Sequence, residues 1–142
     1  MILLGLDFGK KRVGTAISHG IVAQSYATID FDEAKFELFL LKIKKIIAEQ
    51  KVDKVVIGIP LGRDGKETCQ GIWTKEQADR LKGTLEVPVV FVEESFSSTE
   101  ALSQISEFAI SKKRKRQKGL IDMESARIIL HQYLNEDASS SL

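Results

Sequence analysis

Two short apolar runs limit the folds that are open to this chain. Residues 54–59 and 87–92 are rich in Val and Ile, and neighbouring positions in each run are apolar, so neither run has a polar face. Such strands are typical of parallel sheets that are covered on both faces. Residues 68–83, which lie between them, have a weak helical pattern. The chain is therefore predicted to contain a strand–helix–strand unit with parallel strands.

The first thirty residues predict antiparallel strands. An apolar run over residues 2–7 ends at Asp7, a turn follows at residues 8–11, and residues 13–18 and 21–29 are two further strand-like runs. Turns this short join antiparallel strands. We therefore expect three antiparallel strands followed by two parallel strands, which makes a five-stranded mixed sheet of the α/β class.

The spacing of apolar residues predicts helices on both faces of that sheet. Asp30 and Glu33 fit a capping box in front of a long amphipathic helix over residues 36–47. A second capping box at residues 97–100 opens another helix, and Asp122 precedes a final amphipathic helix. Strand and helix alternation of this kind favours a layered α/β domain.

Length and composition fit one folded domain, which we expect over residues 1–136 with a polar tail over 137–142. The chain has 142 residues, of which 43% are hydrophobic and 29% charged, as is usual for globular proteins. No apolar run reaches the roughly 18 residues of a membrane span, and no signal peptide is evident. We therefore expect a cytoplasmic protein without a membrane partner. One cysteine and two distant histidines exclude a disulfide-stapled or zinc-built fold.

Charge is unevenly divided along the chain. The net charge is +1, yet residues 112–118 hold six of the 21 basic residues and no acidic residue. The rest of the chain carries 15 basic and 20 acidic residues. The basic segment is either a solvated loop or a contact for nucleic-acid phosphates. In the second interpretation, the contacts are made by Lys113, Arg114, Lys115 and Arg116.

Three acidic residues stand where expected elements end or begin. Asp7 closes the first strand, Glu94 ends the last strand, and Asp122 opens the last helix. In open α/β sheets, sites form beyond the carboxyl ends of the strands. If these ends converge, the three carboxylates would hold Mg²⁺ or Mn²⁺ and support hydrolysis of a phosphodiester bond. Each also has a structural alternative, as a turn residue, a solvated acid beside Glu93, or a helix cap.

Basic residues in two predicted loops could contact phosphates beside this cleft. Lys10, Lys11 and Arg12 lie in the first turn, and Arg63 lies in the loop after the run at residues 54–59. Phosphate contacts of this kind orient a nucleic acid without reading its sequence. The alternative is that Lys10, Lys11 and Arg12 are ordinary polar turn residues.

Four motifs resemble those of the YqgF/RuvX family, whose members are described as pre-16S ribosomal RNA nucleases and as Holliday-junction-resolvase-like proteins. In chain order the motifs are Asp7 to Ala16, Gly58 to Leu61 with Asp64-Gly65, Glu93-Glu94 before Ser97-Ser98, and Asp122 before Ser125-Ala126 with Ile129-Leu130. The resemblance covers residues 2 to about 134. It implies an RNase H-like fold and a metal site at Asp7, Glu94 and Asp122.

The resemblance further implies a nuclease that matures the 5′ end of 16S ribosomal RNA. Its partners would be a ribosomal RNA precursor and the ribosomal subunit or its assembly factors. This sequence departs from the usual family pattern at two positions. Ser95 stands where the family commonly has Arg, and Glu93 stands where Asp is usual. The Ser95 departure favours one alternative, a catalytically silent RNA-binding or ribosome-assembly factor. The other alternative is a Holliday-junction resolvase acting on DNA.

The sequence leaves the choice between RNA and DNA open. Phosphate contacts carry no information about the sugar, and no aromatic stacking platform is evident from the sequence. The oligomeric state is open as well, although Trp73 and Phe96 are candidates for an interface.

Overall fold

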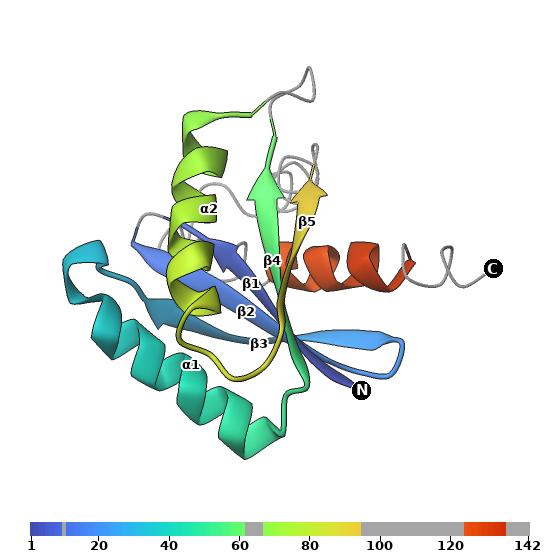
Figure 1. Ribbon diagram of the computed structural model, residues 1–142. Coiled ribbons are helices and arrows are strands. Elements are labelled where there is room, and N and C mark those ends of the chain that lie inside the picture. Colours follow the sequence, from blue (N-terminus) through green and yellow to red (C-terminus); the bar gives the residue numbers. More distant parts are fainter. Residues whose placement is uncertain (10, 62–66, 95–123, 136–142) are drawn as a thin grey trace, which may run out of the picture.

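The computed structural model describes residues 1–9, 11–61, 67–94 and 124–135 (Figure 1). The elements in chain order are β1 (Ile2–Phe8), β2 (Arg12–His19), β3 (Val22–Asp30), a 3₁₀ turn (Glu33–Lys35), α1 (Phe36–Gln50), β4 (Lys54–Pro60), α2 (Cys69–Lys82), β5 (Val89–Glu94) and a helix over residues 124–135. None of these helices is long and apolar enough to cross a membrane.

The strands form one mixed sheet in the order β3-β2-β1-β4-β5. β1 pairs antiparallel with β2, and β2 pairs antiparallel with β3. β4 lies parallel to β1 on its other side, and β5 lies parallel to β4. The predicted order of three antiparallel and two parallel strands is therefore confirmed.

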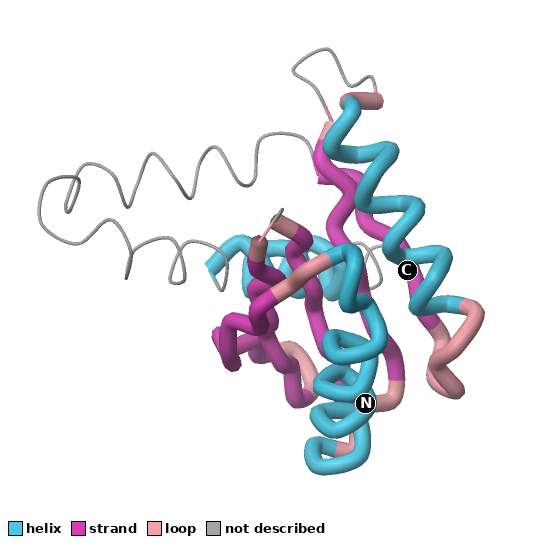
Figure 2. Tube along the Cα trace, turned by 90° about the vertical axis from the view of Figure 1, so that its left-hand side faces the viewer, coloured by secondary structure: helices cyan, strands magenta, loops and turns pink. Residues whose placement is uncertain are grey.

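Alternate residues of the strands belong to two separate cores. Leu4, Leu6 and Phe8 of β1 belong to the core beneath α1 and α2, which lie on the same side of the sheet (Figure 2). Leu3 belongs to the second core, in which Ile129 is also fully buried. The helix over residues 124–135 therefore covers the opposite face, so helices cover both faces as predicted.

An aromatic cluster fills the space between the sheet and its first two helices. Phe8 and Phe39 pack edge to face with ring centroids 5.6 Å apart, and Phe31 contacts Phe39 at 5.0 Å. Trp73 of α2 joins them at 5.7 Å from Phe31. Such packing fixes ring orientation as well as burying apolar surface. The carboxyl end of β1 is thereby held in one position.

On the other face, the helix over residues 124–135 lies directly on β1. A Cβ atom at Gly5 would be 2.6 Å from Cγ of Leu130 and 3.0 Å from the carbonyl oxygen of Ala126. Only glycine permits so close an approach without displacement of the helix. Gly5 thus sets the depth at which this helix sits.

The predicted capping box at Asp30 and Glu33 is wrong. Asp30 is the last residue of β3, and Asp32 instead caps the 3₁₀ turn by accepting a hydrogen bond of 3.0 Å from the Ala34 amide. The reason is Phe31, which is only 5% exposed and enters the core directly after the strand. Its burial prolongs the extended backbone, so the helical turn begins later than the sequence pattern suggests.

Candidate active site at the carboxyl ends of the strands

The register of the parallel strands brings two of the predicted acids to one edge of the sheet. Leu6 of β1 is level with Ile57 of β4, and Pro60 of β4 is level with Glu94 of β5. Asp7 and Glu94 therefore occupy backbone positions near the carboxyl ends of β1 and β5, with β4 between them. Sites of open α/β sheets form at such edges.

Asp7 lies in the face of the sheet that the helix over residues 124–135 covers. Phe8 points into the aromatic cluster on the other face, so alternation directs Asp7 to the same side as Leu3 and Gly5. Asp7 is half-buried there. The same helix covers Gly5 with its Ala126 carbonyl, and Gly5 is two residues before Asp7.

Both lateral neighbours of Asp7 in the sheet are glycines. Gly14 of β2 is its direct partner, and Gly58 of β4 follows Ile57, which pairs with Leu6. Neither neighbour therefore places a side chain beside the Asp7 carboxylate, although both glycines are themselves buried.

Glu124, the first described residue of the last helix, is bound by Arg127. The Arg127 Nε donates to Oε1 of Glu124 over 2.9 Å, and its Nη2 donates to the same oxygen. This hydrogen bond raises the pKa of the Arg127 guanidinium above its ordinary value. The pair stabilises the first turn of the helix and offsets the charge of Glu124.

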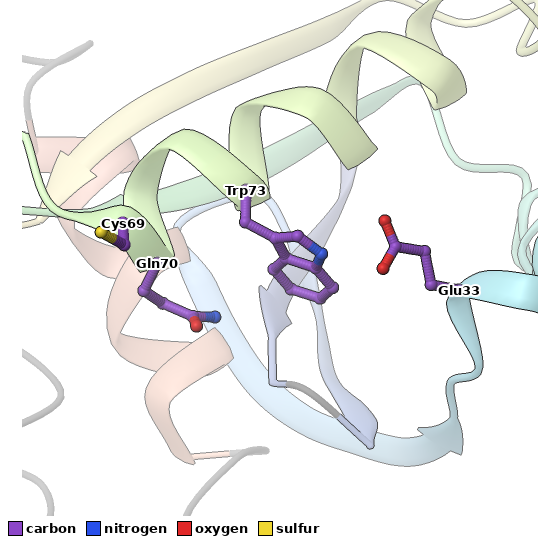
Figure 3. A pocket seen from close by; sticks show the side chains of 4 residues that line it. All are labelled: Glu33, Cys69, Gln70 and Trp73. Atoms are coloured by element: carbon purple, nitrogen blue, oxygen red, sulfur yellow. The ribbon is translucent and has the colours of Figure 1, made fainter.

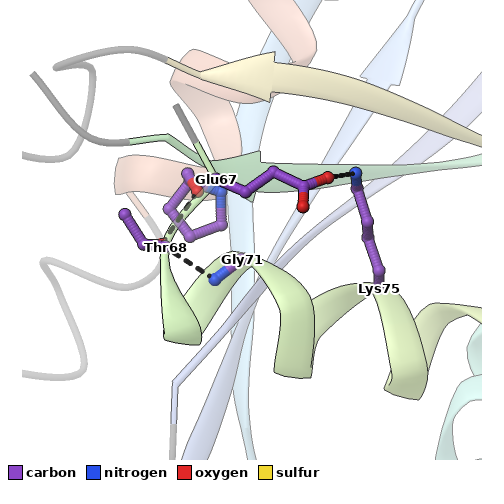
Figure 4. A network of polar contacts seen from close by, with 5 residues as sticks. Glu67, Thr68, Gly71 and Lys75 are labelled. Atoms are coloured by element: carbon purple, nitrogen blue, oxygen red, sulfur yellow. Dashed lines mark hydrogen bonds and ion pairs between the residues drawn. The ribbon is translucent and has the colours of Figure 1, made fainter. Parts of the chain in front are cut away.

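Polar contacts fasten the start of α2 to the end of β4 (Figure 4). The Thr68 hydroxyl accepts a hydrogen bond of 3.0 Å from the Gly71 amide and donates to the Pro60 carbonyl over 3.3 Å. Lys75 pairs with Glu67 over 2.6 Å, and this hydrogen bond raises the Lys75 pKa. Leu61 and Glu67 form an isolated bridge, so the ends of the segment that contains Arg63 meet beside the carboxyl end of β4.

The turn between β1 and β2 is held from both sides. The Gly9 amide donates to the Arg12 carbonyl over 2.8 Å, and the Phe31 amide donates to the Lys11 carbonyl over 2.8 Å. Gln70 Nε2 donates to the Phe8 carbonyl over 3.2 Å. Lys11 is exposed and Arg12 is half-buried. Both residues lie where β2 begins, next to the carboxyl end of the strand that carries Asp7.

The remaining predicted site residues lie beyond what the structure describes. These are Asp122, Lys10, Arg63, Lys113, Arg114, Lys115 and Arg116; for Glu94 only the backbone is described. In the described part of the chain, no group of three His, Cys, Asp or Glu residues could hold a metal ion. The three-carboxylate metal site therefore stays a prediction.

A hollow beside α2 was not predicted from the sequence. It is lined by Glu33, Cys69, Gln70 and Trp73 and has a volume of about 600 Å³ (Figure 3). Glu33 and Trp73 are forty positions apart, and only the packing of α2 against the 3₁₀ turn brings them together. The sole sequence signal was a tryptophan, the only one in the chain, within a largely polar helix.

A sequence model of the RuvX family, described as Holliday junction resolvase, matches residues 1–136. The chain belongs to the RuvX family. A protein of Lactobacillus johnsonii is 38% identical over 136 residues, which are 94% of this chain and 95% of that protein. A protein of Burkholderia ambifaria is 31% identical over 134 residues, 94% of this chain and 89% of the relative. Both relatives carry the name "Putative pre-16S rRNA nuclease".

Solved structures support the fold of this RuvX-family member. Thermus thermophilus RuvC in complex with a Holliday junction substrate has a TM-score of 0.57 at 11% identity, covering 97% of this chain and 96% of RuvC. The fowlpox virus resolvase in complex with Holliday junction DNA has a TM-score of 0.56 at 15% identity, covering 96% and 98%. The RNase H-like fold that the sequence motifs implied is thereby confirmed.

Proposed function

We propose that this RuvX-family protein is an endonuclease that hydrolyses phosphodiester bonds in the precursor of 16S ribosomal RNA. The observation that carries the proposal is the position of Asp7 at the carboxyl end of β1, with side-chain-free neighbours at Gly14 and Gly58. The names of relatives that are 31–38% identical over nearly the whole chain support the choice of substrate.

The proposed metal ligands are Asp7, Glu94 and Asp122. Three carboxylates are hard oxygen donors, which suit Mg²⁺ or Mn²⁺, and the neighbours of Asp7 in the sheet, Gly14 and Gly58, add no side chain that would compete with the ion. When bound, the metal supplies activation of a water molecule and stabilisation of the leaving oxygen. The β1 strand holds the Asp7 carboxylate in place, and Lys11 and Arg12 orient the phosphate next to it.

The test is cleavage of a pre-16S RNA fragment and of a four-way DNA junction, each with Mg²⁺ and with Mn²⁺. Asp7→Asn should lower the rate by about 100-fold or more, because metal coordination contributes several kcal/mol to the transition state. The exposed Asp79 of α2 provides a matched control, and Asp79→Asn should cleave like the wild type. Full activity of Asp7→Asn would contradict the proposed site.

The same assay separates the proposal from its two alternatives. The family description favours DNA junctions, and cleavage of the junction but not of the RNA would assign the protein to that substrate. Binding of RNA without cleavage under any metal condition would indicate a silent assembly factor. For an rRNA nuclease, the proposal includes a cytoplasmic location, with the ribosomal subunit or its assembly factors as partners.

A further inference from the structure

The hollow beside α2 is separate from the proposed catalytic carboxylates. It lies on the side of the sheet that α1 and α2 cover, whereas Asp7 faces the helix over residues 124–135. Its volume of about 600 Å³ is within the range of small-molecule sites. The proposed reaction uses none of Glu33, Cys69, Gln70 and Trp73, which line the hollow.

Trp73 gives the hollow a fixed aromatic wall. Its ring packs against Phe31 at 5.7 Å and Phe8 at 6.3 Å between centroids, both at an interplanar angle of 81°. The side chain is only partly buried, and the remaining surface lines the hollow (Figure 3). A ring that is held in this way can stack with a nucleobase.

Glu33 gives the hollow a positioned carboxylate. Gln77, which is only 1% exposed, donates from Nε2 to Oε1 of Glu33 over 3.1 Å. The Gln77 Oε1 accepts from Arg80, whose guanidinium lies 3.9 Å from the centre of the Phe36 ring. A buried amide with both ends bonded thus holds an exposed acid beside the nitrogen edge of the Trp73 indole (Figure 3).

These two groups select a class of ligand. The Glu33 carboxylate repels a phosphate and accepts hydrogen bonds, so the ligand must present donors. Guanine is the base that offers two adjacent donors, N1–H and N2–H₂, to a carboxylate, whereas uracil offers one. We propose that the hollow binds an unpaired guanine of the substrate strand, stacked on Trp73 with its Watson–Crick edge on Glu33. Unpaired bases in RNA are recognised by this combination of stacking and edge contacts.

The hollow is connected to the proposed site through the turn after β1. Gln70 lines the hollow and donates to the carbonyl of Phe8, the residue after Asp7. Lys11 is exposed, and its carbonyl accepts from Phe31, two residues before Glu33. A strand that crosses this turn could place phosphates at Lys11 and a base in the hollow. This placement of the strand rests on the proposed function.

Trp73 is the only tryptophan, so its fluorescence reports directly on the hollow. We would titrate the intact protein with the RNA pentanucleotides UUGUU and UUUUU in EDTA, where metal-dependent cleavage is prevented. UUGUU should quench the emission and bind about tenfold more tightly than UUUUU, because only guanine can donate two hydrogen bonds to the Glu33 carboxylate. Glu33→Gln should reduce this preference to about twofold. Glu49→Gln, on an exposed acid of α1, should retain it.

Cys69 provides a second readout that does not depend on fluorescence. It is the only cysteine, is exposed and lines the hollow. Saturating UUGUU should slow its alkylation by iodoacetamide several-fold in the wild type and in Glu49→Gln. The protection should be weak in Glu33→Gln at the same RNA concentration.

Three outcomes would overturn the inference. Equal affinity for UUGUU and UUUUU would exclude a guanine site, and an undiminished preference in Glu33→Gln would exclude the stated contact. Equal affinity for GMP and UUGUU would assign the hollow to the free nucleotide instead of a strand. Because binding is measured without metal, guanine preference in a protein that cleaves nothing would contradict only the nuclease proposal. Cleavage without guanine preference would contradict only the hollow.

Discussion

Ser18 in β2 is a buried side chain whose hydroxyl has no bonding partner among the described residues. The residue is fully buried, and it pairs with Leu3 in the apolar core beneath the last helix. Burying a hydroxyl without a partner costs about 1–3 kcal/mol. Ser18→Ala should therefore raise the free energy of unfolding by about 1–2 kcal/mol, as measured by urea denaturation.

Ser25 of the neighbouring strand provides the control, because its side chain is exposed. Ser25→Ala should change the free energy of unfolding by less than about 0.5 kcal/mol. If Ser18→Ala instead destabilises the protein, the hydroxyl is bonded in solution, and its burial is compensated.

A second prediction at the scale of one residue concerns Ser95, which occupies the position where the family commonly has Arg. If that missing cation limits stabilisation of the transition state, Ser95→Arg should raise the cleavage rate by about tenfold under single-turnover conditions. The affinity for uncleaved RNA should change little, since only interactions that are stronger in the transition state accelerate the reaction. An unchanged rate would mean that another cation already performs this role.

At the scale of elements, Gly71 within α2 and Gly83 at the C-terminal cap of α2 differ in the space around them. A Cβ at Gly71 would lie 2.6 Å from the Pro60 carbonyl oxygen, whereas one at Gly83 would lie 3.7 Å from the nearest atom, at φ −76°. Gly71→Ala should destabilise the protein by about 1–3 kcal/mol, because α2 must move away from β4. Thermal unfolding would measure the change.

Gly83→Ala is the matched substitution without a clash. It should be neutral or stabilise by up to about 1 kcal/mol, because it reduces the freedom of the unfolded chain at an unstrained position. Equal effects of the two substitutions would show that the contact between Gly71 and Pro60 does not fix the start of α2. The cleavage rate should fall only in Gly71→Ala, since that end of β4 adjoins the proposed site.

The elements themselves show what the sequence could predict. Apolar runs and their periodicity predicted all five strands. Strands that are buried on one or both faces have alternating or continuous apolar residues, which can be recognised in the sequence. The start of α1 at Phe36 agrees with the predicted helix, whereas the capping residue was mispredicted, because the burial of Phe31 overrides the local capping signal at Asp30. A local capping motif contains no information about the tertiary contacts that bury Phe31.

At the scale of the whole molecule, the position of Asp7 was predictable and the hollow was not. Sheets of this class form sites at the carboxyl ends of strands, so an acid that ends an apolar run is an evident candidate. Glu33 and Trp73 become neighbours only through packing between α2 and the 3₁₀ turn, and Gln77 orients Glu33 from within the core. No spacing in the sequence encodes those contacts.

The charge of the whole molecule leads to a last prediction, which concerns residues 112–118. Outside this segment the chain carries five more acidic than basic residues, so nucleic acid would meet a repulsive surface unless the segment compensates. Each phosphate contact contributes about 0.7–0.9 to the slope of log affinity against log salt. Replacing Lys113, Arg114, Lys115 and Arg116 with Gln should therefore flatten that slope by about two to three units, for RNA and DNA alike.

Salt-dependent binding titrations of the quadruple variant in EDTA would measure this slope. Replacement of Lys42, Lys44, Lys45 and Lys51, all exposed on or just after α1, removes the same charge at another place and provides the control. A smaller change of slope in that control would locate the phosphate contacts in the basic segment, because net charge alone would affect both variants equally. The preference for UUGUU over UUUUU should survive in the quadruple variant, since phosphate contacts position a strand without reading its bases. An unchanged slope would assign the segment to solvation and leave Lys11 and Arg12 as the predicted phosphate contacts within the described structure.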